Sequence, residues 1–125
     1  MALLESGEMY LESILILSEQ NNAVRSIDVS EYMGFSKPSV SRAVGLLKDG
    51  GYITVNDLGH IRLTDAGREV AERIYERHNL LIDVLRRLGV PEDIASEDAC
   101  RLEHYMSATT FDAIKAYAEK AFAKD

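Results

Sequence analysis

The stretch from Ser26 to Gly59 constrains the fold most, because residues that start and stop helices divide it into short elements. Ser26 and Ser36 each precede a run with helical spacing, and Gly34 separates the two runs. Serine accepts hydrogen bonds from the first amide groups of a helix, and glycine commonly ends one. Pro38, in the first turn of the second run, also fits a helix start. The pattern therefore predicts two helices joined by a tight turn, which is a helix-turn-helix.

Two β-forming runs, residues 52–55 and 60–63, follow this motif. Turn-forming residues from Asn56 to Gly59 separate them, so we expect a β-hairpin. In this position a hairpin forms the wing of a winged helix, although small helical domains also carry hairpins for packing alone. The order helix, helix-turn-helix, hairpin favours DNA binding, but a fold by itself does not prove a function.

The distribution of charge is compatible with DNA although the total charge is not. The net charge of −7 opposes binding to phosphates. Residues 25–62, however, carry five basic side chains against four acidic ones, whereas the rest of the chain holds nine against seventeen. From charge alone, a basic DNA-binding surface and ordinary surface scatter are equally good interpretations.

The second helix of the predicted motif has a buried face and an outer face. Its buried face is formed by Val40, Val44 and Leu47. This leaves Lys37, Ser39 and Arg42 on the outer face near the start of the helix. Small hydroxyls and an arginine there suit phosphate contacts and base-edge hydrogen bonds in a major groove.

The other segments predict further helices, so the fold class is mainly α. Apolar spacing predicts an N-terminal helix over residues 7–20 that Ser6 caps. Thr64 caps a long helix that runs to about Leu88, and Gly89 ends it. Pro91 opens the next helix, and Ser107 caps the last one. A chain of 125 residues has too little material to bury both C-terminal helices, so we expect a homodimer.

The sequence Cys100-Arg101-Leu102-Glu103-His104 carries three side chains that ligate metals. Positions i, i+3 and i+4 of a helix share one face, so Cys100, Glu103 and His104 would project toward a common point. Three donors rarely satisfy a divalent cation, which points to further ligands elsewhere in the chain.

Candidate further ligands are Met9, Glu12 and His78. Met9 and Glu12 lie one helical step apart on the N-terminal helix, and His78 lies in the long helix. Each has an ordinary alternative role: a core methionine, a solvated carboxylate and a hydrogen-bonded core histidine. We interpret the N-terminal helix, the long helix and the stretch from Cys100 to His104 as contributing to one metal site, whose occupancy controls the DNA-binding element.

The single cysteine excludes an intramolecular disulfide and suits a reducing compartment. The N-terminal thirty residues show no signal-peptide pattern, and charged residues interrupt every apolar run before it could cross a bilayer. We therefore expect a cytoplasmic protein without a membrane partner.

The sequence resembles the diphtheria toxin repressor family of iron- and manganese-dependent transcriptional regulators. The stretches that carry the resemblance occur in the family's order: residues 8–12, 36–41, 61–64, 77–81 and 99–104. The resemblance implies a winged helix-turn-helix DNA-binding domain, over residues 1–64, and an α-helical metal-binding dimerisation domain, over residues 65–125. It also implies that a metal-bound dimer binds a palindromic operator in double-stranded DNA through its recognition helices.

The family's functional residues carry over to specific positions of this sequence. The primary metal site of iron-responsive members matches Met9, Cys100, Glu103 and His104. His78 matches a ligand of both branches, and Glu12 matches a carboxylate of the manganese branch. The expected DNA-contacting residues surround the start of the second helix of the motif: Arg25, Ser36, Lys37, Pro38, Ser39, Ser41 and Arg42. Ser96 and Ile82 stand where the family usually has ligands of a second metal site. The carboxylate of Asp83 is one position away from where such a ligand is expected.

Ligand chemistry favours iron over manganese. Thiolate and thioether sulfur are soft donors that suit Fe(II), Co(II) or Zn(II), whereas Mn(II) prefers carboxylate and water. Met9 and Cys100 therefore favour Fe(II). Glu12 and the expected absence of a C-terminal SH3-like domain, as in the short manganese-type regulators, favour Mn(II).

Two other classes of protein compete with this interpretation. One is a winged-helix regulator that senses a small molecule or redox state through Cys100 without a metal. The other is a metallohydrolase with Glu103 as general base. We do not expect an enzyme, because no second acid-base group or oxyanion-stabilising set is evident.

Overall fold

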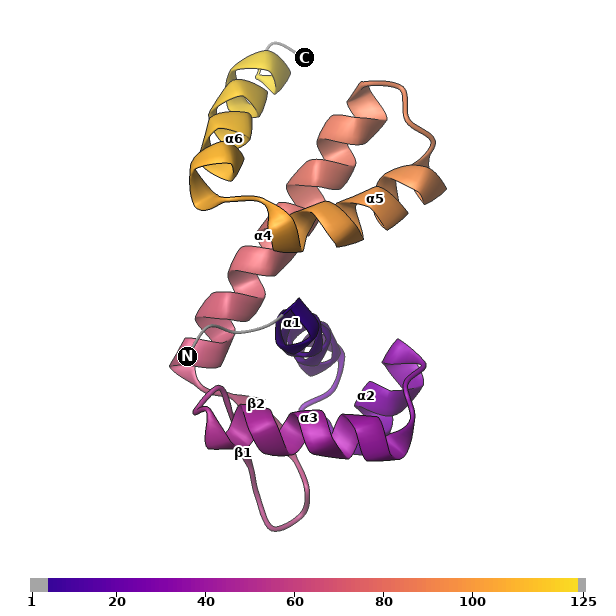
Figure 1. Ribbon diagram of the computed structural model, residues 1–125, viewed down its shortest axis with the longest axis vertical. Coiled ribbons are helices and arrows are strands. Elements are labelled where there is room, and N and C mark those ends of the chain that lie inside the picture. The colour runs from indigo at the N-terminus through magenta and orange to yellow at the C-terminus, as the bar shows by residue number, and fades with distance from the viewer. Residues whose placement is uncertain (1–4, 124–125) are drawn as a thin grey trace. The chain divides into compact units, whose positions relative to one another are not determined.

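The computed structural model describes residues 5–123, and it is mainly helical (Figure 1). The chain divides into two compact units, one reaching Arg73 and the other starting at Ile74. The division falls inside α4 (Asp65–Arg87). The domain boundary expected after residue 64 stays a prediction. None of the described helices is both long and apolar enough to span a membrane.

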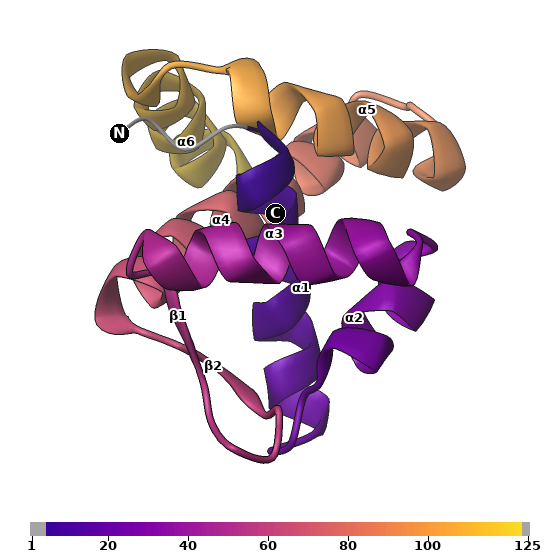
Figure 2. The ribbon, with the colours of Figure 1, turned by 60° about the horizontal axis from the view of Figure 1, so that its bottom comes forward.

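The first unit contains α1 (Glu5–Gln20), α2 (Ser26–Met33), α3 (Lys37–Asp49), β1 (Ile53–Val55), β2 (Ile61–Leu63) and the start of α4. α1 packs against α2, α3 and β2, and α3 crosses it as Figure 2 shows. Aliphatic side chains from all these elements form the core, among them Leu11, Ile14, Val29, Val40, Ile53 and Ile61. Their burial removes apolar surface from water and holds the elements together.

The helix-turn-helix predicted from the sequence is confirmed. Gly34 follows α2 with φ 73°, a left-handed conformation that glycine adopts without a Cβ clash. Ser36 precedes α3, and its hydroxyl accepts a hydrogen bond from the Ser39 amide. Val40, Val44 and Leu47 are buried, as expected.

Two expected helix caps are wrong. Ser26 is the first residue of α2, and Arg25 stands at the cap position with extended backbone. The carboxylate of Asp28, in the first turn of α2, accepts a hydrogen bond from the Arg25 amide at 2.8 Å. A side chain inside the helix therefore caps its start. Ser6 lies within α1, which already includes Glu5, so Ser6 does not cap that helix.

The predicted hairpin is present, with shorter strands than expected. β1 and β2 pair antiparallel, with Ile53 opposite Leu63. The Ile61 amide also donates to the Val24 carbonyl at 2.7 Å, which ties the wing to the segment before α2. At the start of α4, Thr64 caps the helix by accepting a hydrogen bond from the Gly67 amide at 3.1 Å.

The second unit contains the rest of α4, α5 (Glu92–Tyr105) and α6 (Ala108–Phe122). Ser107 caps α6 by accepting a hydrogen bond from the Thr110 amide, as predicted. The buried apolar residues come from all three helices: Ile74, Leu81, Ala95, Ala99, Phe111 and Ala118. The buried alanines lie on the face of α5 that is covered by the other helices of the unit.

Candidate functional site

Three side chains with metal-ligating atoms meet between α4 and α5. A nitrogen of His78, the sulfur of Cys100 and a carboxylate oxygen of Glu103 lie within 4.8 Å of one another. His78 Nδ1 is 2.8 Å from Glu103 Oε2 and 3.8 Å from Cys100 Sγ. Cys100 and Glu103 are one helical step apart on α5, so they share the face that meets His78. In the part of the chain that the structure describes, this is the one group of three such donors.

Glu103 lies at the centre of this cluster, and its side chain is 1% exposed. Its second oxygen, Oε1, is 3.3 Å from Nε2 of His104. Burial raises the pKa of the Glu103 carboxyl, but hydrogen bonds from His104 and His78, with the charges of those histidines, outweigh burial and lower the pKa. The carboxylate is therefore held in the charged form that a metal ion requires.

The donor set fits a divalent transition metal. Imidazole nitrogen, thiolate sulfur and carboxylate oxygen are all ligands for Fe(II), Co(II) and Zn(II). The carboxylate of Glu103 is the buried side of the cluster, and Cys100 is the side that is exposed to solvent. An ion can therefore reach the cluster, and it would find donors already close together.

The other expected metal ligands occupy different positions. His104 joins the cluster through Glu103 and is not one of the three donors within 4.8 Å. Met9 and Glu12 are half-buried residues of α1, in the first unit. Their participation in the metal site stays a prediction.

Arg77 is a residue of this region that reasoning from the sequence missed. It is buried, and its guanidinium donates to the carbonyl oxygens of Glu103 at 3.0 Å and Met106 at 2.8 Å. A signal was available in the sequence, because Arg77 falls between Ile74 and Leu81 at the spacing of the buried face of α4. A charged residue in such a stripe must be paired or hydrogen-bonded to be buried.

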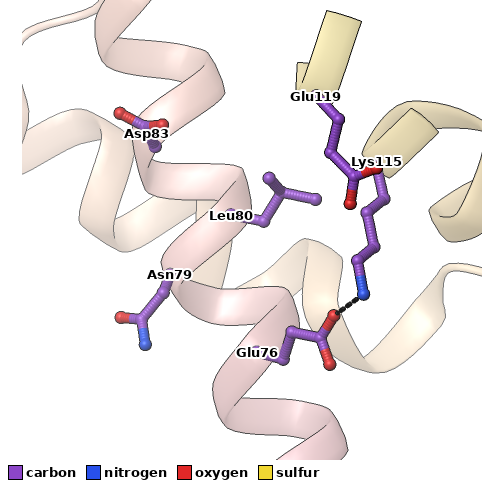
Figure 3. A pocket seen from close by; sticks show the side chains of 6 residues that line it. All are labelled: Glu76, Asn79, Leu80, Asp83, Lys115 and Glu119. Atoms are coloured by element: carbon purple, nitrogen blue, oxygen red, sulfur yellow. Dashed lines mark hydrogen bonds and ion pairs between the residues drawn. The ribbon is translucent and has the colours of Figure 1, made fainter. Parts of the chain in front are cut away.

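A separate hollow of about 400 Å³ lies between α4 and α6 (Figure 3). It is lined by Glu76, Asn79, Leu80, Asp83, Lys115 and Glu119. Lys115 forms an ion pair with Glu76, and this pair raises the pKa of the lysine. The carboxylates of this hollow do not form a metal-ligating group with the described His and Cys residues.

The expected DNA-contacting residues are exposed around the start of α3: Ser36, Lys37, Pro38, Ser39, Ser41 and Arg42. A hollow of about 300 Å³ lies among Ser26, Ile27, Lys37 and Ser41. Arg25 is also exposed, but its guanidinium donates to the Leu58 carbonyl in the wing turn at 2.8 Å. Arg25 therefore stabilises the turn of the wing, in addition to any contact that it makes with DNA.

Two family models match adjacent parts of the chain. Residues 2–61 match the family described as "Iron dependent repressor, N-terminal DNA binding domain". Residues 64–121 match "Iron dependent repressor, metal binding and dimerisation domain". The first match covers the helix-turn-helix and reaches the start of β2, and the second covers the helices that carry His78, Cys100 and Glu103.

Individual relatives agree with the family models. An uncharacterised helix-turn-helix transcriptional regulator of Methanocaldococcus jannaschii is 31% identical over 118 residues, which are 93% of this chain and 94% of that protein. The transcriptional regulator MntR of Escherichia coli O6:H1 is 32% identical over 115 residues, 92% of this chain and 74% of MntR.

A solved structure of the manganese regulator SloR is similar in fold. It superposes with a TM-score of 0.79 at 26% identity, covering 95% of this chain, which spans only 55% of the SloR chain. Taken with the winged helix and the family models, these likenesses show that the chain belongs to the iron-dependent repressor family of metal-dependent, DNA-binding transcriptional regulators.

Proposed function

We propose that this protein represses transcription by binding operator DNA as a homodimer when a divalent metal occupies the cluster on α4 and α5. The observation that carries the proposal is the proximity of His78, Cys100 and Glu103 within 4.8 Å. His104, Met9 and Glu12 are the further ligands we propose, from their sequence positions and the resemblance to the family. The cytoplasm is the compartment we propose, because the ligand thiol requires reducing conditions.

We propose Fe(II) as the metal in preference to Mn(II). A thiolate at Cys100 and a thioether at Met9 are soft donors, and Mn(II) gains less from sulfur than Fe(II) does. The family name refers to iron, whereas SloR is named as a manganese regulator, so the relatives leave the choice to the ligands of this chain. A bound ion supplies charge and fixed geometry, and no chemical reaction is part of this function.

Metal can control DNA affinity only if it binds the DNA-competent arrangement of the protein more tightly than other arrangements. Met9 and Glu12 belong to α1 of the DNA-binding unit, whereas the cluster belongs to the second unit. Ligation by side chains of both would therefore couple metal occupancy to the placement of α3. In a dimer, two copies of α3 would then match the two halves of a palindromic site.

The test combines metal titration with DNA binding in anaerobic, reducing buffer. A DNA fragment selected from a random library with Fe(II) present is labelled, and its fluorescence anisotropy is followed as metal is added. We expect metal-dependent binding by the parent protein and its loss in His78→Ala and Cys100→Ser. Glu97→Gln, which neutralises an exposed carboxylate on the same helix, is the control and should behave as the parent.

Metal-dependent DNA binding that survives both substitutions would overturn the proposed site. The alternative of a regulator that senses a small molecule or redox state through Cys100 predicts a different result. Such a regulator would bind DNA equally with and without metal as long as the thiol stays reduced, and it would respond to an oxidant instead. The same titration therefore separates the two functions.

A further inference from the structure

The main chain at the end of α5 is bound to α4 by the side chain of Arg77. The last carbonyl groups of a helix have no partners within the helix, and they carry the negative end of its dipole. Arg77 Nη1 donates to one of these groups, the Glu103 carbonyl, at 3.0 Å, and also to the carbonyl of Met106, the residue that follows the helix, at 2.8 Å. The guanidinium also lies over the ring of Phe111 in α6, 5.3 Å from its centroid. Three helices therefore meet at this one group.

The position of Arg77 in the chain links this fastening to the metal ligands. Its neighbour His78 contacts the Glu103 carboxylate, while Arg77 itself holds the main chain of Glu103. Glu103 is thus bound to two adjacent residues of α4, by its side chain and by its carbonyl. Because both bonds fix the same residue, Arg77 limits how far the Glu103 carboxylate can move from His78 and Cys100.

The charge of Arg77 is not used elsewhere in the described part of the chain. The two carbonyls and the aromatic ring are its partners, and no carboxylate pairs with it there. Burying a guanidinium without a counter-ion costs free energy, which hydrogen bonds to carbonyls at the negative end of a helix offset. An apolar residue would avoid this cost, so simple packing of α4 gives no reason for an arginine here.

We propose that Arg77 is a positioning residue of the metal site, which fixes Glu103 beside His78 and Cys100 before the metal binds. This inference rests on the proposed metal site. Holding donors in place before binding reduces the ordering that the metal must impose, so affinity rises. Residues that orient metal ligands typically change metal affinity by about 10- to 100-fold when they are removed.

The test uses Co(II) and the purified full chain without DNA. Co(II) is added anaerobically to the parent, Arg77→Met and Arg77→Lys, and visible absorption reports affinity and ligand geometry. We expect Arg77→Met to bind Co(II) at least about tenfold more weakly, with shifted absorption bands. Arg77→Lys should lie between this variant and the parent, because an ammonium donates to carbonyls but lacks the planar fork of a guanidinium.

Arg87→Met is the matched control. Arg87 is also an arginine of α4 stacked on an aromatic ring of α6, with its guanidinium carbon 3.9 Å from the centroid of Phe122. Its guanidinium donates to the Asp83 side chain at 3.3 Å. Arg87→Met should therefore keep the Co(II) affinity and absorption bands of the parent, which would exclude a general effect of removing an arginine from α4.

Amide hydrogen exchange of the metal-free proteins gives a second measurement, which needs no metal. The amides at the end of α5 should exchange faster in Arg77→Met than in the parent or in Arg87→Met. Arg77→Met that binds Co(II) with the affinity and bands of the parent would overturn the inference. If Arg77→Met does not fold, Arg77→Lys decides, and parent-like affinity and exchange in that variant would overturn it.

Failure of the proposed function gives a different pattern. A parent protein that does not bind Co(II), or binds it equally after Cys100→Ser and His78→Ala, would remove the metal site and with it the role of Arg77. A parent that binds Co(II) through those residues, with Arg77→Met unchanged, would remove only the role of Arg77.

Discussion

His78 on α4 and Glu103 on α5 contact each other directly, with Nδ1 of the imidazole 2.8 Å from Oε2 of the carboxylate. This contact joins two helices across 25 positions of sequence, and the carboxylate is almost completely buried. The other oxygen of Glu103 faces His104. Both oxygens of a buried charge therefore have partners even without a metal, so the contact contributes to folding whether or not a metal binds.

Replacing Glu103 by alanine should destabilise the metal-free protein. The change leaves two imidazoles without their carboxylate partner in a buried position, so we expect the free energy of unfolding to fall by roughly 2–4 kcal/mol. Urea denaturation in the presence of a chelator measures this. Glu97→Ala, an exposed site on the same helix, should change stability by less than about 0.5 kcal/mol. Equal stabilities of the two variants would show that the buried contacts of Glu103 contribute nothing to folding.

The sulfur donors should determine which metal activates the protein. The double variant Met9→Asp with Cys100→Glu replaces two soft donors by carboxylates, which Mn(II) prefers. We expect the Mn(II) concentration needed for DNA binding to fall and the Fe(II) concentration to rise, as measured by anaerobic fluorescence anisotropy. His104→Ala should abolish activation by either metal.

The single variants serve as controls for this change. Cys100→Glu alone should shift the preference less than the double variant if Met9 is also a ligand. A double variant that responds to Fe(II) and Mn(II) as the parent does would rule out sulfur ligation as the source of selectivity. A His104→Ala protein that still needs metal to bind DNA would remove His104 from the site.

Arg42 and Lys37 should contribute to DNA binding in different ways. If Arg42 reaches a base edge, Arg42→Ala should cost about 1–3 kcal/mol on the preferred DNA and relax sequence preference. Lys37→Ala should weaken binding to all sequences alike and reduce the dependence of binding on salt. Anisotropy titrations on preferred and random DNA at several salt concentrations compare the two. Equal losses on both kinds of DNA in both variants would contradict these roles.

We predict a homodimer from the apolar surface that the described chain leaves exposed. Leu88 and Tyr117 are each 75% exposed, and they border an apolar groove of about 220 Å³ between α4 and α6. Sedimentation velocity at micromolar concentration should show a dimer, because covering such side chains removes apolar surface from water. Tyr117→Glu should shift the distribution toward monomer. A parent protein that sediments as a monomer both with and without metal would contradict this prediction.

Local signals in the sequence predicted most of the fold. The turn at Gly34, the cap at Ser36 and the buried stripe of α3 depend on residues a few positions apart, and all three are present. The caps expected at Ser6 and Ser26 failed for a local reason as well. A serine in the first turn of a helix resembles a serine at its cap, and only backbone conformation separates the two positions.

Long-range geometry was harder to predict from the sequence. The spacing of Cys100 and Glu103 placed both on one face of a helix, and the structure agrees. Nothing in the sequence around His78 shows that this residue meets Glu103, because the contact depends on how two helices pack. The burial of Arg77 could be inferred from its place on the buried face of α4, but its partners could not, because they are main-chain carbonyls, which any sequence supplies.

The start of α4 approaches the wing so closely that Gly67 should tolerate no side chain. Thr64 bonds to the main chain just before β1, since its hydroxyl donates to the Gly51 carbonyl at 2.7 Å and its amide donates to the Tyr52 carbonyl at 3.0 Å. These bonds bring the first turn of α4 onto Tyr52. A Cβ at Gly67 would overlap the Tyr52 carbonyl oxygen and lie 2.9 Å from its carbon. Main-chain atoms cannot rotate away as a side chain can.

Gly67→Ala should therefore destabilise the protein by about 2 kcal/mol or more, because the helix must move away from the strand or strain its backbone. Gly45→Ala is the matched control, since Gly45 also lies inside a helix and a Cβ there meets nothing within 4 Å. Alanine is the better helix former, so this variant should gain up to about 1 kcal/mol. Thermal and urea denaturation compare both with the parent. We expect the free energy of unfolding to fall in Gly67→Ala and to rise in Gly45→Ala. A Gly67→Ala protein as stable as the parent would mean that α4 and the wing are less closely packed than the Tyr52 contact implies.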